Sequence, residues 1–287
     1  MIFGYHIDFC DEPSLNHPTD PSSAKSTIAV KACLLPQFTI LTDYFPHSLQ
    51  HVRYGGHRPF ETTKGKNVEW MMEIENTLTL VWFPQSRTIG YEKGERFTPE
   101  RLRFWVYHTF LPLLLQMEGV YHILHVGCVE VKGKAVIFMA PSFGGKSTLT
   151  DYFLQRGHKL LSDDTLAIEQ RADGSHRAVA SWPFQRPYRQ PETLGDETKH
   201  FATMPLEIAA VYRLEKTDET APVTLEAVKG IEKFKTLHYG SFIPLGFLKE
   251  ETFAFHTEFA KAVPVYRVDI PWDKERLSEV YDAIIAW

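Results

Sequence analysis

A nine-residue segment in the middle of the chain has the residue types that hold phosphate. Glycines let backbone N–H groups approach phosphate oxygens, Lys146 can reach terminal phosphates, and the Ser147 hydroxyl can ligate Mg²⁺. The segment runs Ala140, Pro141, Ser142, Phe143, Gly144, Gly145, Lys146, Ser147 and Thr148. It fits a phosphate-binding P-loop, with Ala140 in place of the usual first glycine. We expect residues 142–148 to contact a nucleotide.

A pair of acidic residues follows this segment at short range. Asp163 lies 17 positions after Lys146, and Asp164 is next to it, at the end of a predicted strand. One carboxylate beside a P-loop can hold Mg²⁺, and a second can accept a proton from an attacking hydroxyl. Adjacent strand residues point to opposite faces, so both reach one site only if the backbone turns here. A solvated turn containing two acids is the alternative.

The elements around the segment are those that must position it. Residues 135–139 form an apolar run typical of a buried strand, and residues 147–155 have the pattern of a helix. Leu149, Phe153 and Leu154 mark its apolar side, and Gly157 ends it. The helix N-terminus adds partial positive charge under the phosphates. Strand, glycine-rich turn and helix together favour a nucleotide site over an ordinary glycine-rich loop.

The remaining elements suggest two domains. We expect a strand-rich N-terminal module over residues 1–97, with a hairpin formed by residues 68–74 and 78–83. Thr98 should cap a buried helix that runs to Glu118 and bends at Pro112. An α/β catalytic domain should fill residues 98–287. In it we expect an extended run over 120–131, a hairpin formed by 166–169 and 176–180, and a last helix capped by Asp273.

Composition limits the classes of partner. The 287 residues carry a net charge of −5, and the pI near 6.2 argues against broad nucleic-acid binding. No apolar stretch is long enough to span a bilayer, and no signal peptide is evident. The three cysteines are far apart and favour a reducing compartment, so we expect a cytoplasmic protein. We interpret His47, His51 and His57 as loop histidines rather than a metal site.

The motif set resembles the HPr kinase/phosphorylase family and its HPr-kinase-related members. Transporter-type ATPases and small GTPases share the P-loop, but their other signatures, Leu-Ser-Gly-Gly and Asn-Lys-x-Asp, are absent. The resemblance covers residues 124–168 and includes a histidine about 21 residues before the P-loop lysine. Its elements are Leu124-His125-Val126-Gly127, Gly145-Lys146-Ser147, Arg156-Gly157-His158 and Asp163-Asp164. It implies a P-loop kinase domain of the HPr-kinase type, preceded by a strand-rich α+β module.

The resemblance also implies an activity and roles for residues. The chain would be an enzyme that uses Mg²⁺ and ATP to transfer the γ-phosphoryl group to a hydroxyl, expected to be a serine of a protein or peptide. Lys146 would hold phosphates, Ser147 and Asp163 the metal, and Asp164 would be the general base, although the two aspartates are interchangeable at this stage. His125 would act near the γ-phosphate, or be a hydrogen-bonded core histidine. Family members are often oligomeric, so a homo-oligomer is also expected.

Departures from the family pattern leave the acceptor open. Residues 182–189 stand where the family has a Glu-Ile-Arg-Gly-Leu-Gly-Ile stretch, and its loop for dephosphorylation has no clear match. Reverse phosphorylase activity and HPr as substrate are therefore not expected. Arg186 and Arg189 are either a clamp for phosphate or an acidic substrate, or surface arginines. A kinase of a small hydroxylated metabolite and a nucleotide-binding sensor without transfer activity are the alternative functions.

Overall fold

A computed structural model describes most of the chain as two compact units. The described residues are 1–17, 24–38, 40–46, 51–62, 67–186, 192–242 and 245–286. The first unit comprises Met1–Tyr121, Gln190–Leu194 and Leu245–Leu248, and the second comprises His122–Arg189, Gly195–Pro244 and Lys249–Trp287. The helices after residue 97 belong to the first unit, whereas we expected the boundary before them. The roles assigned to an accessory module and a catalytic domain stay predictions.

The first unit is built on a seven-stranded sheet in the order β1-β2-β7-β6-β5-β4-β3. Its strands are β1 (His6–Phe9), β2 (Thr27–Ala32), β3 (Ile40–Pro46), β4 (His51–Gly56), β5 (Trp70–Ile74), β6 (Leu78–Phe83) and β7 (Thr88–Lys93). β5 and β6 form the predicted hairpin, with Asn76 in the turn at a φ of 56°. Single-turn helices at Pro13–Leu15, Phe60–Thr62 and Gly246–Leu248 complete the unit together with the helical segment that follows β7.

The predicted helix of the first unit begins as expected but is not a continuous α-helix. The Thr98 side chain accepts a hydrogen bond from the Arg101 N–H, and α1 (Pro99–Trp105) follows. A π-helical turn (Val106–Phe110) precedes α2 (Leu111–Met117). Pro112 lacks an N–H to donate to the carbonyl four residues back, and the Leu111 N–H bonds to the Val106 oxygen five residues back. The bend expected at Pro112 is thus a widened turn just before it.

The second unit has a nine-stranded mixed sheet, so the chain is a mixed α/β protein with several sheets. The order is β11-β9-β10-β16-β13-β12-β8, with β18 beside β16 and β17 beside β18. Its strands are β8 (His122–Leu124), β9 (Gly127–Val131), β10 (Lys134–Met139), β11 (Lys159–Ser162), β12 (Leu166–Gln170), β13 (His176–Val179), β16 (Leu206–Thr217), β17 (Thr224–Ala227) and β18 (Val265–Pro271). The short strands β14 (Phe184–Gln185) and β15 (Asp196–Glu197) pair separately. β10, β16 and β18 run parallel to one another.

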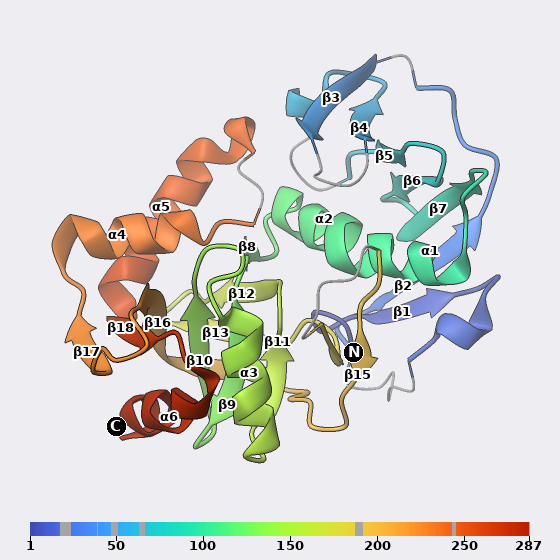
Figure 1. Cartoon of the computed structure of the whole chain (residues 1–287). Helices are drawn as coiled ribbons and strands as arrows, with labels where there is room; N and C mark the ends of the chain where they lie inside the picture. The colour runs from blue at the N-terminus through green and yellow to red at the C-terminus, as the bar shows by residue number, and fades with distance from the viewer. Residues whose placement is uncertain are drawn as a thin grey trace. The chain divides into compact units, whose positions relative to one another are not determined.

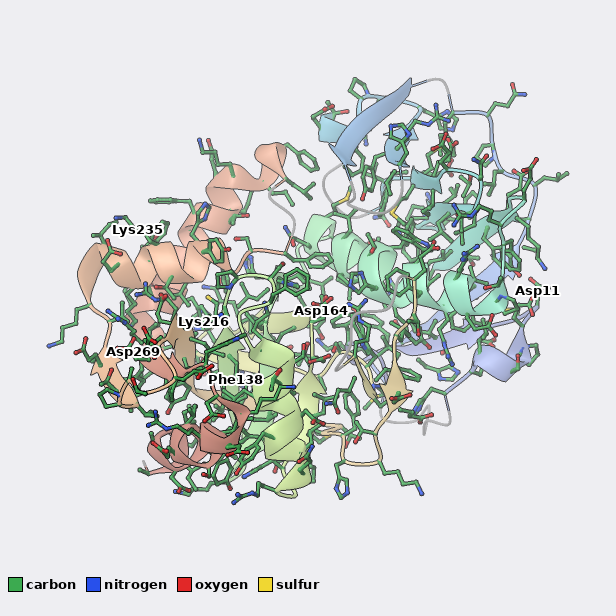
Figure 2. The ribbon with its side chains drawn as sticks, viewed as in Figure 1. Asp11, Phe138, Asp164, Lys216, Lys235 and Asp269 are labelled. Atoms are coloured by element: carbon green, nitrogen blue, oxygen red, sulfur yellow. The ribbon has the colours of Figure 1, made fainter. Side chains whose placement is uncertain are left out.

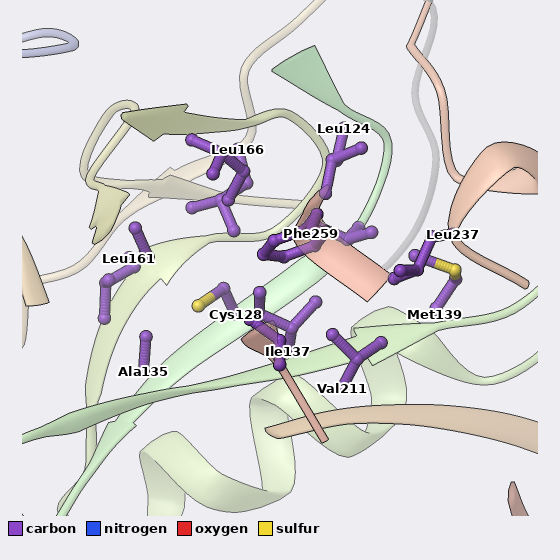
Figure 3. Packing of buried hydrophobic residues seen from close by; sticks show 14 of the residues in the cluster. Leu124, Cys128, Ala135, Ile137, Met139, Leu161, Leu166, Val211, Leu237 and Phe259 are labelled. Carbon is purple, nitrogen blue, oxygen red and sulfur yellow. The ribbon is translucent and has the colours of Figure 1, made fainter. Parts of the chain in front are cut away.

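Helices cover both faces of this sheet (Figure 1). α4 (Gly230–Tyr239) and α5 (Lys249–Ala262) pack on one face, and α3 (Lys146–Gln155) and α6 (Leu277–Ile285) on the other. Strand β10 supplies both cores by alternation. Ala135, Ile137 and Met139 face the cluster that contains Phe259 of α5 (Figure 3), whereas Val136 and Phe138 face α3 and α6. This two-sided burial fixes the end of β10, from which the candidate loop departs.

Most local predictions for the second unit are confirmed, and one is wrong. The β12–β13 hairpin, the helix after the glycine-rich segment and the Asp273 cap of the terminal helical segment lie where expected. The extended run predicted over residues 120–131 is broken at His125. β8 pairs with β12, while β9 pairs with β10 and β11, so the chain must change neighbours between them. His125 therefore lies between two strands rather than within one.

Candidate functional site

The glycine-rich segment forms a tight turn between β10 and α3. The Gly144 N–H donates to the Pro141 oxygen at 3.0 Å, and Phe143 and Gly145 have φ values of 63° and 90°. A Cβ on Gly144 would lie 2.7 Å from the Ala140 Cβ. Real atoms do not approach so closely, so Gly144 must be glycine because Ala140, 4% exposed, fills the space beneath it. The turn therefore accommodates Ala140 at the position where a P-loop usually has its first glycine.

The N-terminus of α3 opens onto the same turn. Gly145 is the residue before the helix, and no side chain among the described residues caps it. The first N–H groups of a helix lack partners within the helix and carry partial positive charge. The Lys146 side chain lies against the turn, where Nζ donates to the Ala140 oxygen at 2.7 Å and the Pro141 oxygen at 3.3 Å. Backbone dipoles and a cation thus converge at one place.

Asp163, directly after β11, is a buried carboxylate. Only 4% of it is exposed; Oδ2 accepts a hydrogen bond from the Arg186 N–H at 2.8 Å, and Oδ1 has no hydrogen-bond partner among the described residues. Burial raises the pKa of Asp163, the Asp164 charge adds to the shift, and the Arg186 N–H and the Ser147 hydroxyl oppose it. The environment therefore leaves one buried oxygen of Asp163 in need of a donor or a cation.

Asp164 is more accessible and contacts the side chains of Arg186 and His125. Oδ2 accepts a hydrogen bond from Arg186 Nη2 at 2.7 Å, and His125 Nδ1 lies 3.2 Å from Oδ1 (Figure 2 labels Asp164). Its side chain is 19% exposed, and that of His125 38%. The Val126 N–H donates to the Asp164 backbone oxygen at 3.0 Å, and this bond helps to turn the chain after β11. This turn brings the carboxylates of both aspartates to one site, which was the condition for the two to act together.

One pocket of about 460 Å³ joins these groups within the second unit. All the predicted site residues line it: His125, Ser142, Phe143, Gly144, Gly145, Lys146, Ser147, Thr148, Asp163 and Asp164. Arg186 also lines it and pairs with Asp164, with 12% of its side chain exposed, and its role as a clamp for phosphate or an acidic substrate stays a prediction. Arg189 lies outside the described residues.

Trp272 is a lining residue that sequence reasoning missed. It follows the last strand, β18, which runs parallel to β16 and, through it, to β10. The carboxyl ends of neighbouring parallel strands share an edge of the sheet, where ligands commonly bind. The position of Trp272 directly after a strand is visible in the sequence. It points to the pocket only once the strand order is known.

The described residues contain no group of three or more His, Cys, Asp or Glu side chains placed to hold a metal ion. Of the three histidines considered above, His47 lies outside the described residues. His57 instead lies 3.4 Å from Glu69, a pair open to solvent. None of the helices in the described part of the chain is long and apolar enough to cross a membrane. Cys10, Cys33 and Cys128 are all free.

Comparison with known proteins gives a similarity in structure only. No protein-family model and no curated protein matches this chain. The chain resembles the solved structure of the HPr(Ser) kinase/phosphatase from Coxiella burnetii, with a TM-score of 0.36 and 13% sequence identity. The similarity covers 57% of this chain and 87% of that one. Because so low a TM-score carries no argument, the function is argued below from the chain's own residues.

Proposed function

We propose that the chain is an ATP- and Mg²⁺-dependent kinase that transfers the γ-phosphoryl group to a hydroxyl, namely a serine of a protein or peptide. The observation that carries the proposal is that Lys146, Ser147, Asp163 and Asp164 line one pocket. A phosphoryl transfer site needs a phosphate cradle, a metal position and a base within reach of one another. The motif supplies the residue types, and the pocket supplies their proximity.

Phosphate would bind at the turn between β10 and α3. The uncapped N-terminus of α3 directs N–H groups and partial positive charge toward an anion. Lys146 Nζ, which contacts the Ala140 and Pro141 oxygens, would exchange a loop carbonyl for a phosphate oxygen while staying in place. Because that carbonyl contact already orders the lysine, little side-chain entropy is lost when phosphate binds.

The residues present fit a magnesium ion. Asp163 Oδ1 is buried without a hydrogen-bond partner in the described structure, and the Ser147 hydroxyl is near enough to affect the Asp163 pKa. Mg²⁺ favours a few carboxylate and hydroxyl oxygens together with phosphate oxygens, so it does not need a cluster of protein ligands. Ser147 and Asp163 would hold it. There it would neutralise charge on the phosphates.

Asp164 is the better placed of the two aspartates to act as base. It is more exposed than Asp163, and His125 and Arg186 fix its orientation. In the reaction, the acceptor oxygen forms a bond to the γ-phosphorus as the bond from that phosphorus to the bridging β-oxygen breaks. The acceptor proton passes to Asp164, and ADP leaves. Arg186 and Lys146 offset the charge that develops on the transferred group.

Transfer from γ-labelled ATP tests this proposal. Cell extract separated into protein, peptide and small-molecule fractions would be the acceptor, and wild type would be compared with Asp164→Asn. We expect label in the protein or peptide fraction, and a loss of about 10²-fold or more in the variant, because general base catalysis contributes roughly that much. Asp173→Asn, which alters an exposed aspartate in the β12–β13 turn, is the matched control and should transfer normally.

The same experiment separates the alternative functions. Label confined to small molecules would replace the proposal with a metabolite kinase. Nucleotide binding without transfer to any fraction would replace it with a sensor, and Asp163→Asn and Asp164→Asn would then leave affinity unchanged. We also propose that the partners are a nucleotide and a protein or peptide rather than nucleic acid or a membrane. Sedimentation of the purified chain would test the expected homo-oligomer.

A further inference from the structure

A second, apolar pocket lies against the helix that carries the candidate phosphate site. Its volume is about 200 Å³, and its walls come from α3, from the end of β18 and from the start of the terminal helical segment. It is lined by Gly145, Thr148, Leu149, Ile270, Pro271, Trp272, Asp273, Lys274 and Leu277. Gly145, Thr148 and Trp272 also line the larger pocket. A ligand can therefore occupy both pockets at once.

Trp272 is held at the boundary between the two pockets. Its backbone N–H donates to the Thr217 backbone oxygen at 3.3 Å, and Lys216 Nζ lies 4.1 Å from the centre of its ring, over one face (Figure 2 labels Lys216). A Cβ on Gly145 would lie 3.6 Å from the edge of the indole. The ring thus packs against the backbone of the turn, yet the residue remains 41% exposed. Large exposed aromatic side chains at a pocket commonly bind planar ligands.

We propose that this apolar pocket, with Trp272 as its wall, binds the purine base of the nucleotide whose phosphates occupy the larger pocket. The inference rests on the proposed function, since it requires a nucleotide at the turn before α3. Gly145, Thr148 and Trp272 line both pockets, so one nucleotide can place its phosphates at Lys146 and Ser147 and its base in the apolar pocket. An apolar heterocycle suits the lining, and a polypeptide would not fit the volume.

The lining also defines the selectivity of the pocket. Apart from Thr148, its polar side chains are Asp273 and Lys274, and Asp273 Oδ1 already accepts a hydrogen bond from the Glu275 N–H at 2.9 Å. Discrimination among bases by hydrogen bonding needs several fixed donors and acceptors. The affinity gained from contact with an apolar wall and an indole instead depends on the contact area of the base. ATP and GTP should therefore bind within a few-fold of each other, and CTP and UTP more weakly.

Calorimetric titration with Mg·ATP and with Mg·tripolyphosphate, which has no base, tests the inference. Wild type should bind ATP about ten- to one hundred-fold more tightly than tripolyphosphate, the usual range for one base stacked on an aromatic side chain. In Trp272→Ala, ATP affinity should fall to near the tripolyphosphate affinity of the same variant, because the base then has no aromatic side chain to stack on. Phe253→Ala, at an exposed aromatic residue on α5, is the matched control and should change neither.

The outcomes separate this inference from the proposed function. If neither Mg·ATP nor Mg·tripolyphosphate binds, both the base pocket and the proposed function are rejected. If wild type binds the two equally, or if Trp272→Ala binds ATP as wild type does, the base pocket alone is rejected and the phosphate site stands. Photolabelling of wild type with 8-azido-ATP gives a test that needs no variant. Label should fall on residues 270–277, and label confined to other segments would overturn the proposal.

Discussion

Two groups of titratable side chains in the second unit differ in their access to a ligand. His125, Lys146, Asp163 and Asp164 line an open pocket, and their charges are of both signs. His122, His176, His238 and His256 form a second group around Phe255 and Phe259. The first group resembles a reaction site in composition. The second has as many ionisable groups but no carboxylate among its ring contacts.

The surroundings explain the different chemistry of the two groups. The ring of His122 stacks on Phe255 at 3.8 Å between centres, and His256 is 1% exposed. Burial, together with neighbouring histidines, lowers the pKa of His256 to about 3 and that of His122 to about 4. These rings are therefore neutral packing groups near pH 7. A cluster of histidines in a fold is thus no sign of catalysis unless charge partners and an opening accompany it.

The largest expected difference between the two groups is the effect on the transfer rate when Lys146 is replaced. Lys146→Met keeps the length of the side chain and removes its charge, so transfer should fall about 10²- to 10³-fold, as for other fixed groups that stabilise transition-state charge. Thermal stability should change little. Initial rates and melting curves measure both, with Lys235→Met on the exposed face of α4 as the control. Full activity in Lys146→Met would remove the pocket from consideration as a reaction site.

A second large effect is expected from Gly144→Ala. The new methyl would lie 2.7 Å from the Ala140 Cβ and 3.0 Å from the Pro141 oxygen, so the turn must shift. Overpacking typically costs about 1–3 kcal/mol, and ATP affinity should fall roughly ten- to one hundred-fold. Adding Ala140→Gly to the variant removes the atom in conflict and should restore much of the affinity.

Gly133→Ala provides the control for this variant. Gly133 lies in the β9–β10 turn with a φ of 77°, and a Cβ there would meet nothing within 4 Å. The substitution therefore tests backbone strain without a clash at the turn before α3, and ATP affinity should stay at the wild-type value. If the double variant Gly144→Ala, Ala140→Gly binds no better than Gly144→Ala alone, crowding by Ala140 is not the reason for the glycine.

Sequence patterns predicted the local parts of the site and missed the parts that depend on strand order. Strand, turn and helix around Lys146 follow from residues close in the chain, and so does the turn after β11. By contrast, β16 pairs with both β10 and β18, strands that lie far apart in sequence, and this pairing brings Trp272 to the pocket. Periodicity within a segment carries no information about such pairing.

The same distinction explains the two residues that the sequence left ambiguous or misplaced. Arg186 stood in a proline-rich segment with no periodic pattern, and only the contacts of its backbone and side chain with Asp163 and Asp164 assign it to the site. His125 was expected within one extended run. The chain instead leaves β8 and joins β9 at that point, because the two strands have different neighbours, and the break carries His125 toward Asp164.

A smaller effect on rate is expected when His125 is replaced. His125→Gln keeps a hydrogen-bond donor but cannot carry charge beside Asp164, and we expect transfer to fall roughly tenfold, at the lower end for a group that acts through a base. The free energy of unfolding should stay near the wild-type value because His125 is partly exposed. Single-turnover rates and urea unfolding at pH 7 measure these. An unchanged rate would leave His125 as a structural histidine, like those around Phe255.

The smallest effect concerns the buried histidines and appears in stability rather than rate. The pKa values of His256 and His122 in the fold lie below the value of about 6.5 for an unfolded histidine. The unfolded chain therefore takes up more protons as pH falls below 6.5, and stability should decrease by up to about 1.4 kcal/mol per pH unit for each ring until the folded pKa values are reached. Above pH 7 these rings should contribute no pH dependence.

Urea unfolding at pH 7 and pH 5 measures this loss. His256→Gln removes one titrating ring, so it should reduce the pH dependence whatever it does to stability at pH 7. His200→Gln alters an exposed histidine of the same unit and should leave the dependence intact. In addition to burial, His238 and His122 lower the pKa of His256. Glu258 acts in the opposite direction on His176, where burial lowers the pKa and the Glu258 charge raises it. The Glu258 charge therefore favours protonation of one ring in the group. Equal slopes in wild type and His256→Gln would mean that His256 has the same pKa in the folded and the unfolded chain, and the contrast between the two groups would then lie in access alone.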